Sequence, residues 1–285
     1  MSRGSKSSKL RSALVIFQFA TSSVLIISTA IVYQQMQFIL TEDVGFDKEQ
    51  VILLQGANTL EKQLPTFKSE LQQLSDVEQV SVSDYLPIAG TKRNGNLFWK
   101  EGKVTEDVGI GGQRWRVDED YLATMGMNIV EGRNFNVGMA SDSQAVIINQ
   151  RMAQELGLDN PIGERITNRG DVWQIIGVVQ DFNYQSLKEK IRPLCLVLGN
   201  SSSVVSVKVN TTDMQETMEN VKAVWNRFSP NQAIRYTFLD ESFAMMYTDV
   251  QRMGRIFTSF AVLAIVIACL GLFALSAFMA DQRRK

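Results

Sequence analysis

Two long uncharged segments, one near each end of the chain, restrict what this sequence can fold into. Residues 13–33 and residues 256–280 contain 21 and 25 residues, mostly apolar, without any Asp, Glu, Lys or Arg. About 20 consecutive apolar residues, rising about 1.5 Å each, cross a hydrocarbon core of roughly 30 Å as an α-helix. The sequence therefore predicts two membrane-spanning helices, with a large central domain on one side of the bilayer.

The charges beside the two segments indicate the orientation of the chain. Residues 1–12 carry four basic side chains and no acidic one, and residues 281–285 carry a net charge of +2. Because the whole chain has a net charge of −1, the stretch between these flanks has a net charge of −7. Basic flanks stay in the cytoplasm, whereas long loops are translocated largely regardless of charge. We therefore predict that both termini are cytoplasmic and that the central domain is extracytoplasmic.

Each apolar segment also has an alternative interpretation. Residues 13–33 could be the core of a cleaved signal peptide, although such cores usually have about 7–15 residues and precede a small-x-small cleavage site. No clear site of that kind follows this segment. Residues 256–280 could instead be a buried core helix, but 25 uncharged and mostly apolar residues argue against a soluble core.

The remainder, about 220 residues, is long enough for one large domain or two small ones. Its composition excludes several functions. The chain has no His, which is the commonest general base and a leading zinc ligand. It also lacks a Cys cluster and the GxSxG, Walker A and GxGxxG motifs. We therefore expect no enzyme activity, with no catalytic residue, cofactor or metal. The acidic balance argues against nucleic acid as a partner.

Four local features have structural interpretations. Cys195 and Cys269 fall in different phases, the exported part and the second span, so no disulfide between them is expected. The glycine cluster at 109–112 indicates a bulge or turn rather than a phosphate cradle. Three carboxylates within residues 117–121 are explained by a helix N-terminus, without a metal. Residues 210–212 fit a glycosylation sequon or a helix N-cap, and we favour the cap.

Two stretches about 150 residues apart look like copies of one strand–helix–strand unit. In each, apolar residues repeat at spacings of four and three, which places them on one helix face. Pro65 interrupts the first pattern, so the regular helix is expected to begin there. Two such units form a four-stranded sheet covered by two helices, with Phe67 and Trp225 buried against it. The predicted strands are 51–54, 77–82, 204–209 and 234–238, and the helical patterns are Leu60, Leu64, Phe67, Leu71, Leu74 and Met214, Met218, Val221, Trp225, Phe228.

Between the two copies, residues 98–198 read as an inserted, β-rich lobe. Gly126 and Gly157 lie where the C-caps of two short helices are expected. Pro161 and Gly163 mark a turn before a strand that contains Ile166. The other predicted strands are 108–117, 144–148 and 172–179, and the two short helices are 118–125 and 149–156.

The predicted fold class is α+β, with two transmembrane helices and helical stalks flanking a two-lobed domain. The first helical pattern continues to residue 42 and stops near Gly45. Asp240 can cap a second stalk, and no Pro interrupts residues 240–280, so one continuous helix is expected there. Rigid stalks of this kind either transmit displacement or only hold the domain above the bilayer. The predicted segments are 1–12 (cytoplasmic), 13–43 (span and stalk), 44–239 (central domain, with lobe 1 at 44–97 and 199–239 and the inserted lobe at 98–198), 240–280 (stalk and span) and 281–285 (cytoplasmic).

Several blocks of the sequence resemble one family, in the same order. Residues 13–54, ALVIFQFATSSVLIISTAIVYQQMQFILTEDVGFDKEQVILL, resemble the span and stalk that precede the outer domain of MacB/FtsX-type ABC transporter permeases, especially the Bacteroidetes-like exporters. VDEDYLATMGMNIVEGRNFN, AVIINQRMAQELGLDNPIGERI and WQIIGVVQDFNYQSLKEKIRPL, which begin at residues 117, 145 and 173, are similar to its periplasmic core domain. Residues 253–285, MGRIFTSFAVLAIVIACLGLFALSAFMADQRRK, resemble its next span.

The resemblance implies a bacterial inner-membrane permease with its main domain in the periplasm. It also implies an ABC ATPase as a separate or fused subunit, a second permease copy, the lipid bilayer, and a periplasmic adaptor or substrate protein as partners. In that scheme ATP-driven dimerisation moves the stalks and the periplasmic domains. Members continue into a cytoplasmic segment and two more spans, so the chain is expected to be a fragment of a longer permease.

Two other functions are compatible with part of the sequence. A two-span sensor would bind a ligand in the central domain and signal through its second helix, which requires a cytoplasmic output module. A membrane-anchored enzyme has less support, because no nucleophile–base constellation is present. The transported substrate stays open between lipoprotein, peptide, macrolide and cell-wall regulation.

Overall fold

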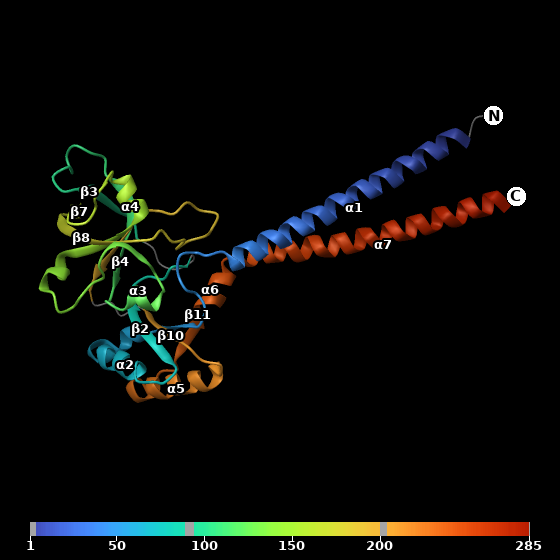
Figure 1. Ribbon diagram of the computed structural model, residues 1–285. Helices are drawn as coiled ribbons and strands as arrows, with labels where there is room; N and C mark the ends of the chain where they lie inside the picture. Colours follow the sequence, from blue (N-terminus) through green and yellow to red (C-terminus); the bar gives the residue numbers. More distant parts are fainter. Residues whose placement is uncertain (1–3, 89–93, 200–203, 285) are drawn as a thin grey trace. The chain divides into compact units, whose positions relative to one another are not determined.

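The computed structural model describes residues 4–88, 94–199 and 204–284 (Figure 1). The chain divides into two compact units. One is a helix pair formed by residues 1–42 and 247–285, and the other is a central domain formed by residues 43–246. The predicted fold class, α+β with an apolar helix at each end of a β-rich domain, is confirmed.

The helix pair consists of α1 (Gly4–Thr41) and α7 (Thr248–Arg284), which pack antiparallel. Their inward residues alternate at spacings of four and three, the heptad pattern of a coiled coil. Several of those on α7 are small, which lets the backbones approach closely. A Cβ added at Gly254 would lie 3.2 Å from Val32 Cγ1. The buried or half-buried residues at this spacing are Gln18, Ser22, Leu25, Thr29, Val32, Met36 and Ile39 on α1, and Val250, Gly254, Phe257, Ala261, Ala264, Ala268 and Gly271 on α7.

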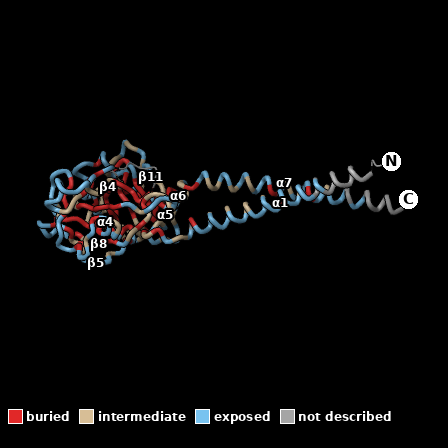
Figure 2. The backbone as a smooth tube through the Cα atoms, turned by 90° about the horizontal axis from the view of Figure 1, so that it is seen from above, coloured by how far each residue is buried: buried red, intermediate tan, exposed pale blue. Residues whose placement is uncertain are grey.

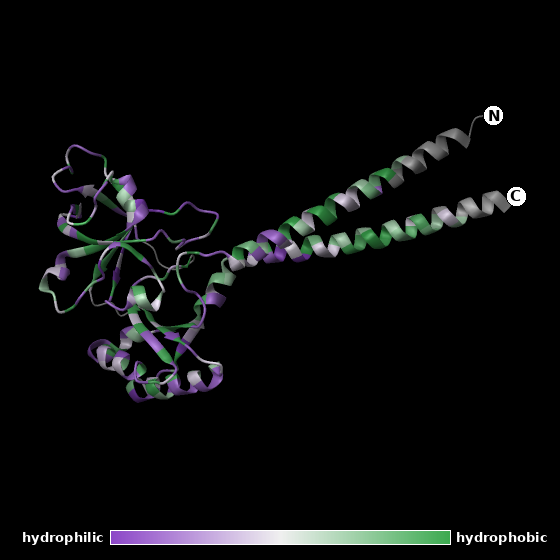
Figure 3. Ribbon diagram, in the orientation of Figure 1, coloured by the Kyte–Doolittle hydropathy of each residue, from purple (hydrophilic) through white to green (hydrophobic). Residues whose placement is uncertain are grey.

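Away from this seam, many of the described residues of both helices are apolar and exposed (Figure 3). Segments long and apolar enough to cross a membrane run over Ile16–Ile39 and Thr248–Ala274. Large side chains such as Phe17, Phe260 and Phe273 are exposed along them. An exposed apolar surface of this extent is stable in lipid and costly in water, so the packing agrees with the two predicted spans.

The prediction of one continuous helix over residues 240–280 is wrong. The structure has α6 (Leu239–Met245), a two-residue turn, and then α7. The Met246 amide donates to the Phe243 carbonyl, so the last turn tightens to an i−3 bond and the regular helix stops. Asp240 is also not the cap: Phe238 is, and Asp240 lies in the first turn, where its carboxylate accepts from the Glu241 amide. No Pro or Gly marks this break.

The repeated units fold as predicted into one lobe of the central domain (Figure 1). Four strands lie in the order β11-β1-β10-β2, antiparallel throughout, which is the arrangement of a split β-α-β pair. Two helices complete a shared hydrophobic core with the sheet, drawn red in Figure 2. The helical elements are η1 (Ala57–Gln63), α2 (Leu64–Leu71) and α5 (Met214–Phe228), and the strands are β1 (Val51–Gln55), β2 (Val77–Ser83), β10 (Val204–Val209) and β11 (Arg235–Phe238). Pro65 lies at the start of α2, as expected.

A second hydrophobic cluster belongs to the strands between the two copies. The sheet continues from β2 to β4 through a single pair, Ser83 opposite Val117, and then passes through β3, β7, β8, β6 and β9, with β5 beside β8. The elements are β3 (Asn96–Lys100), β4 (Ile110–Val117), α3 (Tyr121–Thr124), β5 (Ile129–Gly132), η2 (Ala140–Gln144), β6 (Ala145–Asn149), α4 (Gln150–Glu155), β7 (Arg165–Asn168), β8 (Asp171–Val179) and β9 (Leu194–Leu198). The sequence did not predict β3, β5 or β9.

Local signals in this region were partly right. Gly126 and Gly157 end α3 and α4 with φ of 60° and 63°, and Asn149 caps α4.

The predicted cap at residues 210–212 is misplaced, because Asp213 caps α5 by accepting from the amides of Gln215 and Glu216. Asp213 was passed over because an Asn-Thr-Thr run, which is equally good capping chemistry, precedes it.

Candidate functional site

Two chain segments connect the central domain to the helix pair, and each carries an aromatic residue that packs against the aromatic residue of the other. Phe46 follows α1 by a few residues, and Phe243 lies in α6, immediately before α7. Their ring centroids are 6.5 Å apart with edge-to-face geometry. Phe46 also packs edge-to-face on Phe182, at 6.4 Å. The two connections are therefore tied together inside the central domain.

The aromatic contacts continue to the strand that joins the two lobes. Phe182 packs on Trp115 of β4 at 6.1 Å, and Trp115 packs on Tyr184 at 5.1 Å and stacks on Tyr85 at 6.0 Å. We call Phe46, Tyr85, Trp115, Phe182, Tyr184 and Phe243 the aromatic junction. All six are buried. Pairs of this kind add about 0.5–1.5 kcal/mol each beyond area burial, so these contacts stabilise the packing of both connections on β4.

Backbone bonds hold the first connection against the junction. The Asn183 amide donates to the Val44 carbonyl at 2.8 Å. Gly45 has φ of +83°, and a Cβ there would lie 2.7 Å from Phe182 Cβ. A left-handed residue without a side chain is thus required where the chain enters the domain.

The second feature is a cleft of about 560 Å³ between α2 and the segment that follows β4. Lys68, which projects from α2, contacts carboxylate oxygens of both Asp118 and Asp120 at 2.7 Å. Asp118 also accepts from the Val82 amide at 2.7 Å through the same oxygen, Oδ2. The walls are Glu61, Lys62, Leu64, Pro65, Val82, Glu119, Val137 and Gly199.

The charges in this cleft are not evenly compensated. Asp118 Oδ1 is buried and has no hydrogen-bond partner among the described residues. Burial raises the pKa of Asp118 to about 6, against the opposing effect of the Lys68 charge. Burial alone would lower the pKa of Lys68, but the charges of Asp118 and Asp120 and the hydrogen bonds to them raise it. The cleft thus holds an ammonium shared by two carboxylates, one of which can take up a proton near neutral pH.

This arrangement refines the interpretation of the carboxylates at 117–121. They lie at a helix N-terminus, as predicted, but α3 is only the short segment Tyr121–Thr124 and Asp120, at its N-cap, makes no side-chain cap bond. Asp118 and Asp120 bind Lys68 instead, a residue that the sequence analysis did not single out. A Lys on an exposed helix flank carries no signal by itself, and its partners lie 50 residues away.

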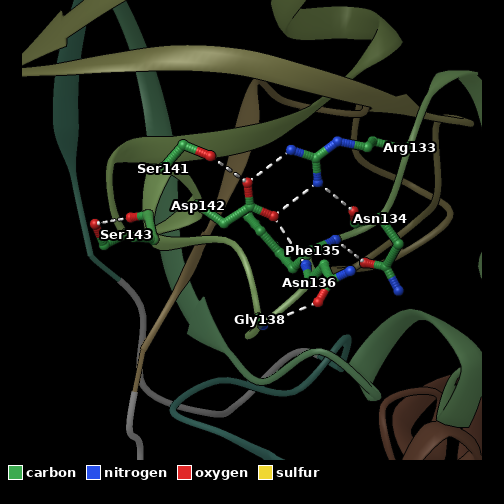
Figure 4. Close-up of polar contacts among 9 residues, drawn as sticks. Arg133, Asn134, Phe135, Asn136, Gly138, Ser141, Asp142 and Ser143 are labelled. Atoms are coloured by element: carbon green, nitrogen blue, oxygen red, sulfur yellow. Dashed lines mark hydrogen bonds and ion pairs between the residues drawn. The ribbon is translucent and has the colours of Figure 1, made fainter.

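An ion pair between a partly exposed Arg and a buried Asp organises the loop after β5 (Figure 4). Arg133 donates to both carboxylate oxygens of Asp142, each at 2.7 Å. The Asn136 amide donates to the same carboxylate at 2.8 Å. The Asp142 side chain is fully buried, and the hydrogen bonds from Arg133 hold its pKa below the usual range. This network fixes the loop, and Arg133 and Asp142 also line a hollow of about 450 Å³.

Replacing Asp118 by Asn is expected to remove a pH dependence of stability. Because the Asp118 pKa is about 6 in the fold and 3.8 ordinarily, the folded state keeps a proton that the unfolded state releases between these values. Linkage then lowers the free energy of unfolding as pH rises from about 4 to about 6, by about 2 kcal/mol. Urea unfolding of the 43–246 fragment across this range measures the slope in the parent and in the Asn variant. Equal slopes in both proteins would contradict this assignment.

Asp142→Asn is the control of opposite sign. The pKa of Asp142 is lowered, so its stabilisation is present above 3.8 and is lost as pH falls through the lower folded value. At pH 7 the Asn variant is expected to lose about 2 kcal/mol, because it gives up hydrogen bonds to a charged group.

Reactive chemistry has little support in the part of the chain that is described. No group of three or more His, Cys, Asp or Glu side chains with metal-binding geometry occurs there. Burial in β9 raises the pKa of Cys195 to about 12, so its thiol is not a nucleophile. Gly109 has φ of 76° and precedes β4, whereas Gly111 and Gly112 lie inside the strand. The cleft presents an ammonium and two carboxylates, and the aromatic junction joins the two connections to β4.

Comparison with known proteins relates this chain to transporter domains. The sequence model of one family, described as the MacB-like periplasmic core domain, matches residues 13–231. The chain resembles the periplasmic region of MacB from Actinobacillus actinomycetemcomitans, with 12% identity and a TM-score of 0.49, covering 71% of this chain and 94% of that one. It also resembles the extracellular domain of the ABC-type transporter YknZ from Gram-positive bacteria, with 18% identity and a TM-score of 0.45, covering 70% of this chain and 92% of that one. The match to a domain of a permease protein from Porphyromonas gingivalis has 12% identity and a TM-score of 0.44, and covers 67% of this chain and 90% of that one. A search of curated proteins finds no match.

Proposed function

The chain belongs to the MacB-like periplasmic core domain family of ABC transporter permeases, and on that premise we propose that it couples cytoplasmic ATP hydrolysis to motion of its central domain. The proposal makes it a permease subunit that works by mechanotransmission. As a permease subunit it would have no enzyme activity of its own. The ATPase is a separate or fused subunit.

The observation that carries the proposal is the aromatic junction. A domain that is only tethered to a membrane needs no rigid link between its two connections. Here Phe46 and Phe243, one from each connection, share an edge-to-face contact and reach Trp115 through Phe182. Interfaces packed in this way move as a body rather than deform continuously. A displacement delivered to either connection is therefore passed to the strand that joins the lobes.

The helix pair supports the same proposal from the membrane side. Its heptad seam runs from Gln18 to Ile39 on α1 and from Val250 to Gly271 on α7. A seam of this length favours motion of the two helices as one unit, and the predicted spans at residues 13–33 and 256–280 contain no Asp, Glu, Lys or Arg that would line a pore. We propose a second permease copy, the ATPase and a periplasmic adaptor or substrate protein as partners, in a bacterial inner membrane.

Topology is the first consequence of the proposal that can be tested. A single Cys at Ser5 should be protected from a membrane-impermeant maleimide in intact cells, and a single Cys at Val108 should be labelled, because Val108 is 92% exposed and lies in the extracytoplasmic domain. Cys269 is replaced by Ala in both proteins, and the buried Cys195 can stay because its raised pKa leaves it unreactive. Labelling at Ser5 but not at Val108 would reverse the orientation.

A further inference from the structure

A second hollow region is lined largely by β3, β4 and the turn after β7, and it shares no lining residue with the cleft at Lys68. It consists of two hollows of about 610 Å³ and 140 Å³ that share Asn96 and Arg169. We call it the arginine groove. Its larger hollow has walls of Leu97 and Trp99, and its smaller hollow is lined by Arg114 and Arg116.

The groove concentrates positive charge within an acidic chain. Arg114, Arg116 and Arg169 line the smaller hollow, and Arg192 lines the larger one. Two of the four have only distant ion partners: Arg114 lies 3.9 Å from Asp171, and Arg192 lies 3.8 Å from Glu189. The guanidinium groups of the other two, Arg116 and Arg169, have no ion pair with a described residue. Asp84 is the acidic side chain in the lining, and it accepts from the backbone amide of Arg116.

The fold holds these arginines in place. Arg114 and Arg116 alternate with the buried Trp115 on β4, so both lie on the same face of the sheet. A ladder of asparagines ties the neighbouring strands together. Asn94 Nδ2 donates to the Arg114 carbonyl at 2.6 Å, and Asn168 Nδ2 donates to the Leu97 carbonyl at 2.9 Å. The strand carrying two arginines and the turn carrying Arg169 are thus fixed to a common frame, which is the preorganisation that anion binding requires.

Arg169 occupies a strained position. It is the first residue of the two-residue turn between β7 and β8, where Asn168 pairs with Asp171. Arg169 and Gly170 have φ of 53° and 91°. A turn with positive φ at both central residues favours Asn-Gly, and Arg is unfavourable at its first position. Strain at a residue whose charge lines a hollow is the kind of outlier that accompanies a binding role.

The larger hollow offers apolar surface beside this charge. The Leu97 side chain is about half exposed. The Trp99 ring is held by a hydrogen bond from Nε1 to the Asp107 carbonyl at 3.0 Å. Gly95 and Gly111 leave the floor open, since a Cβ added at either would meet nothing within 4 Å. Glycine within a strand often marks close approach by a ligand.

We propose that the arginine groove binds a small amphipathic anion, in which a carboxylate or phosphate group meets Arg169 with Arg114 or Arg116 and an apolar body lies on Leu97, Trp99 and the Gly111 backbone. Guanidinium groups match carboxylate and phosphate oxygens in pairs, and the combined volume is in the range of small-molecule sites. The free acid of a small molecule and the C-terminal carboxylate of a peptide share this chemistry. The site is independent of the proposed transport function.

Binding is tested by calorimetry on the full chain in nanodiscs. The probes are phenyl phosphate and 3-phenylpropionate, with 2-phenylethylamine as the apolar cation and inorganic phosphate as the anion without an apolar body. The two aromatic anions are expected to bind at least tenfold more tightly than either control, and more weakly as salt is raised. A tetrapeptide ending in Phe-Leu, with free or amidated C-terminus, distinguishes the two sources. Binding of the free form alone at the same site assigns a peptide end, and no binding of either form assigns a small molecule.

Two variants in the groove and one control outside it keep the test independent of folding. Arg169→Asn creates the preferred Asn-Gly turn, so it is expected to raise the melting temperature while weakening anion binding at least tenfold. Gly111→Val places a strand-favouring side chain in open space and should block the apolar body. Arg165→Gln removes the same charge from β7 outside the groove and should bind like the parent. Equal binding by the parent and the Arg169→Asn variant, or equal binding of the amine and the acids, would overturn the proposal.

Discussion

Truncating Phe67 or Trp225 to Ala is expected to lower the free energy of unfolding of the 43–246 fragment by about 3–5 kcal/mol. Both side chains are fully buried, on α2 and α5 respectively. Their ring centroids lie 5.6 Å apart with edge-to-face geometry, so each truncation leaves a cavity against the other ring. Trp225 also donates from Nε1 to the Gln232 carbonyl at 2.8 Å, which its truncation would leave unpaired.

Urea unfolding monitored by far-UV circular dichroism measures both effects. Glu219→Ala, on the exposed face of α5, is the matched control and should change stability by less than about 0.5 kcal/mol. Because the two rings touch, the double variant should lose less than the sum of the single losses. Losses under about 1 kcal/mol for the single variants would contradict a core shared by the two repeated units.

This core is also where the sequence was most informative. Apolar residues at spacings of four and three identified α2 and α5, a short apolar run identified β1, and apolar residues interspersed with polar ones identified the other three strands of that lobe. When one face of a helix or strand is buried, apolar residues must recur at the spacing of that face, so the pattern can be read directly from the sequence. The inserted lobe was harder. Its β5, Ile129–Gly132, is mostly exposed, and so lacks the alternation that marks a half-buried strand.

The two candidate sites could not have been predicted in the same way. The contact of Lys68 with Asp118, and that of Phe46 with Phe243, join residues far apart in the sequence. The periodicity of apolar residues shows which face of a helix or strand is buried, but it does not show which distant residues contact that face. The break at residues 246–247 has no Pro or Gly to mark it either. Hydrogen bonding at the end of α6 decides it.

Inserting two glycines between Met246 and Tyr247 is expected to abolish transport while leaving basal ATP hydrolysis intact. The insertion falls in the turn between α6 and α7, so both helices and the aromatic junction keep their residues. Gly is the most flexible residue, and a Gly pair turns a two-residue turn into a loose hinge. Displacement of α7 would then be absorbed before it reaches Phe243.

The matched control is the same two-glycine insertion between Gly102 and Lys103, in the exposed turn between β3 and β4. It adds the same flexibility to the same domain outside either connection and should transport like the parent. A second insertion, between Glu42 and Asp43, should act like the first, because the first connection enters the same junction. If the variant with two glycines after Met246 transports at the parental rate, α6 and α7 only anchor the central domain and do not transmit displacement to it.

The most direct test of coupling is a distance measured between two copies of the permease as ATP binds. A nitroxide label on a Cys that replaces Val108, in the Cys269→Ala background, reports the distance between the two central domains by pulsed electron–electron double resonance. With the partner ATPase held in its ATP-bound state by a hydrolysis-deficient substitution, the distance distribution is expected to shift in the parent permease. It should stay unchanged in the permease with two glycines after Met246, although that protein still assembles with the ATPase. A distribution in the parent that ATP does not alter would contradict coupling between the helix pair and the central domain.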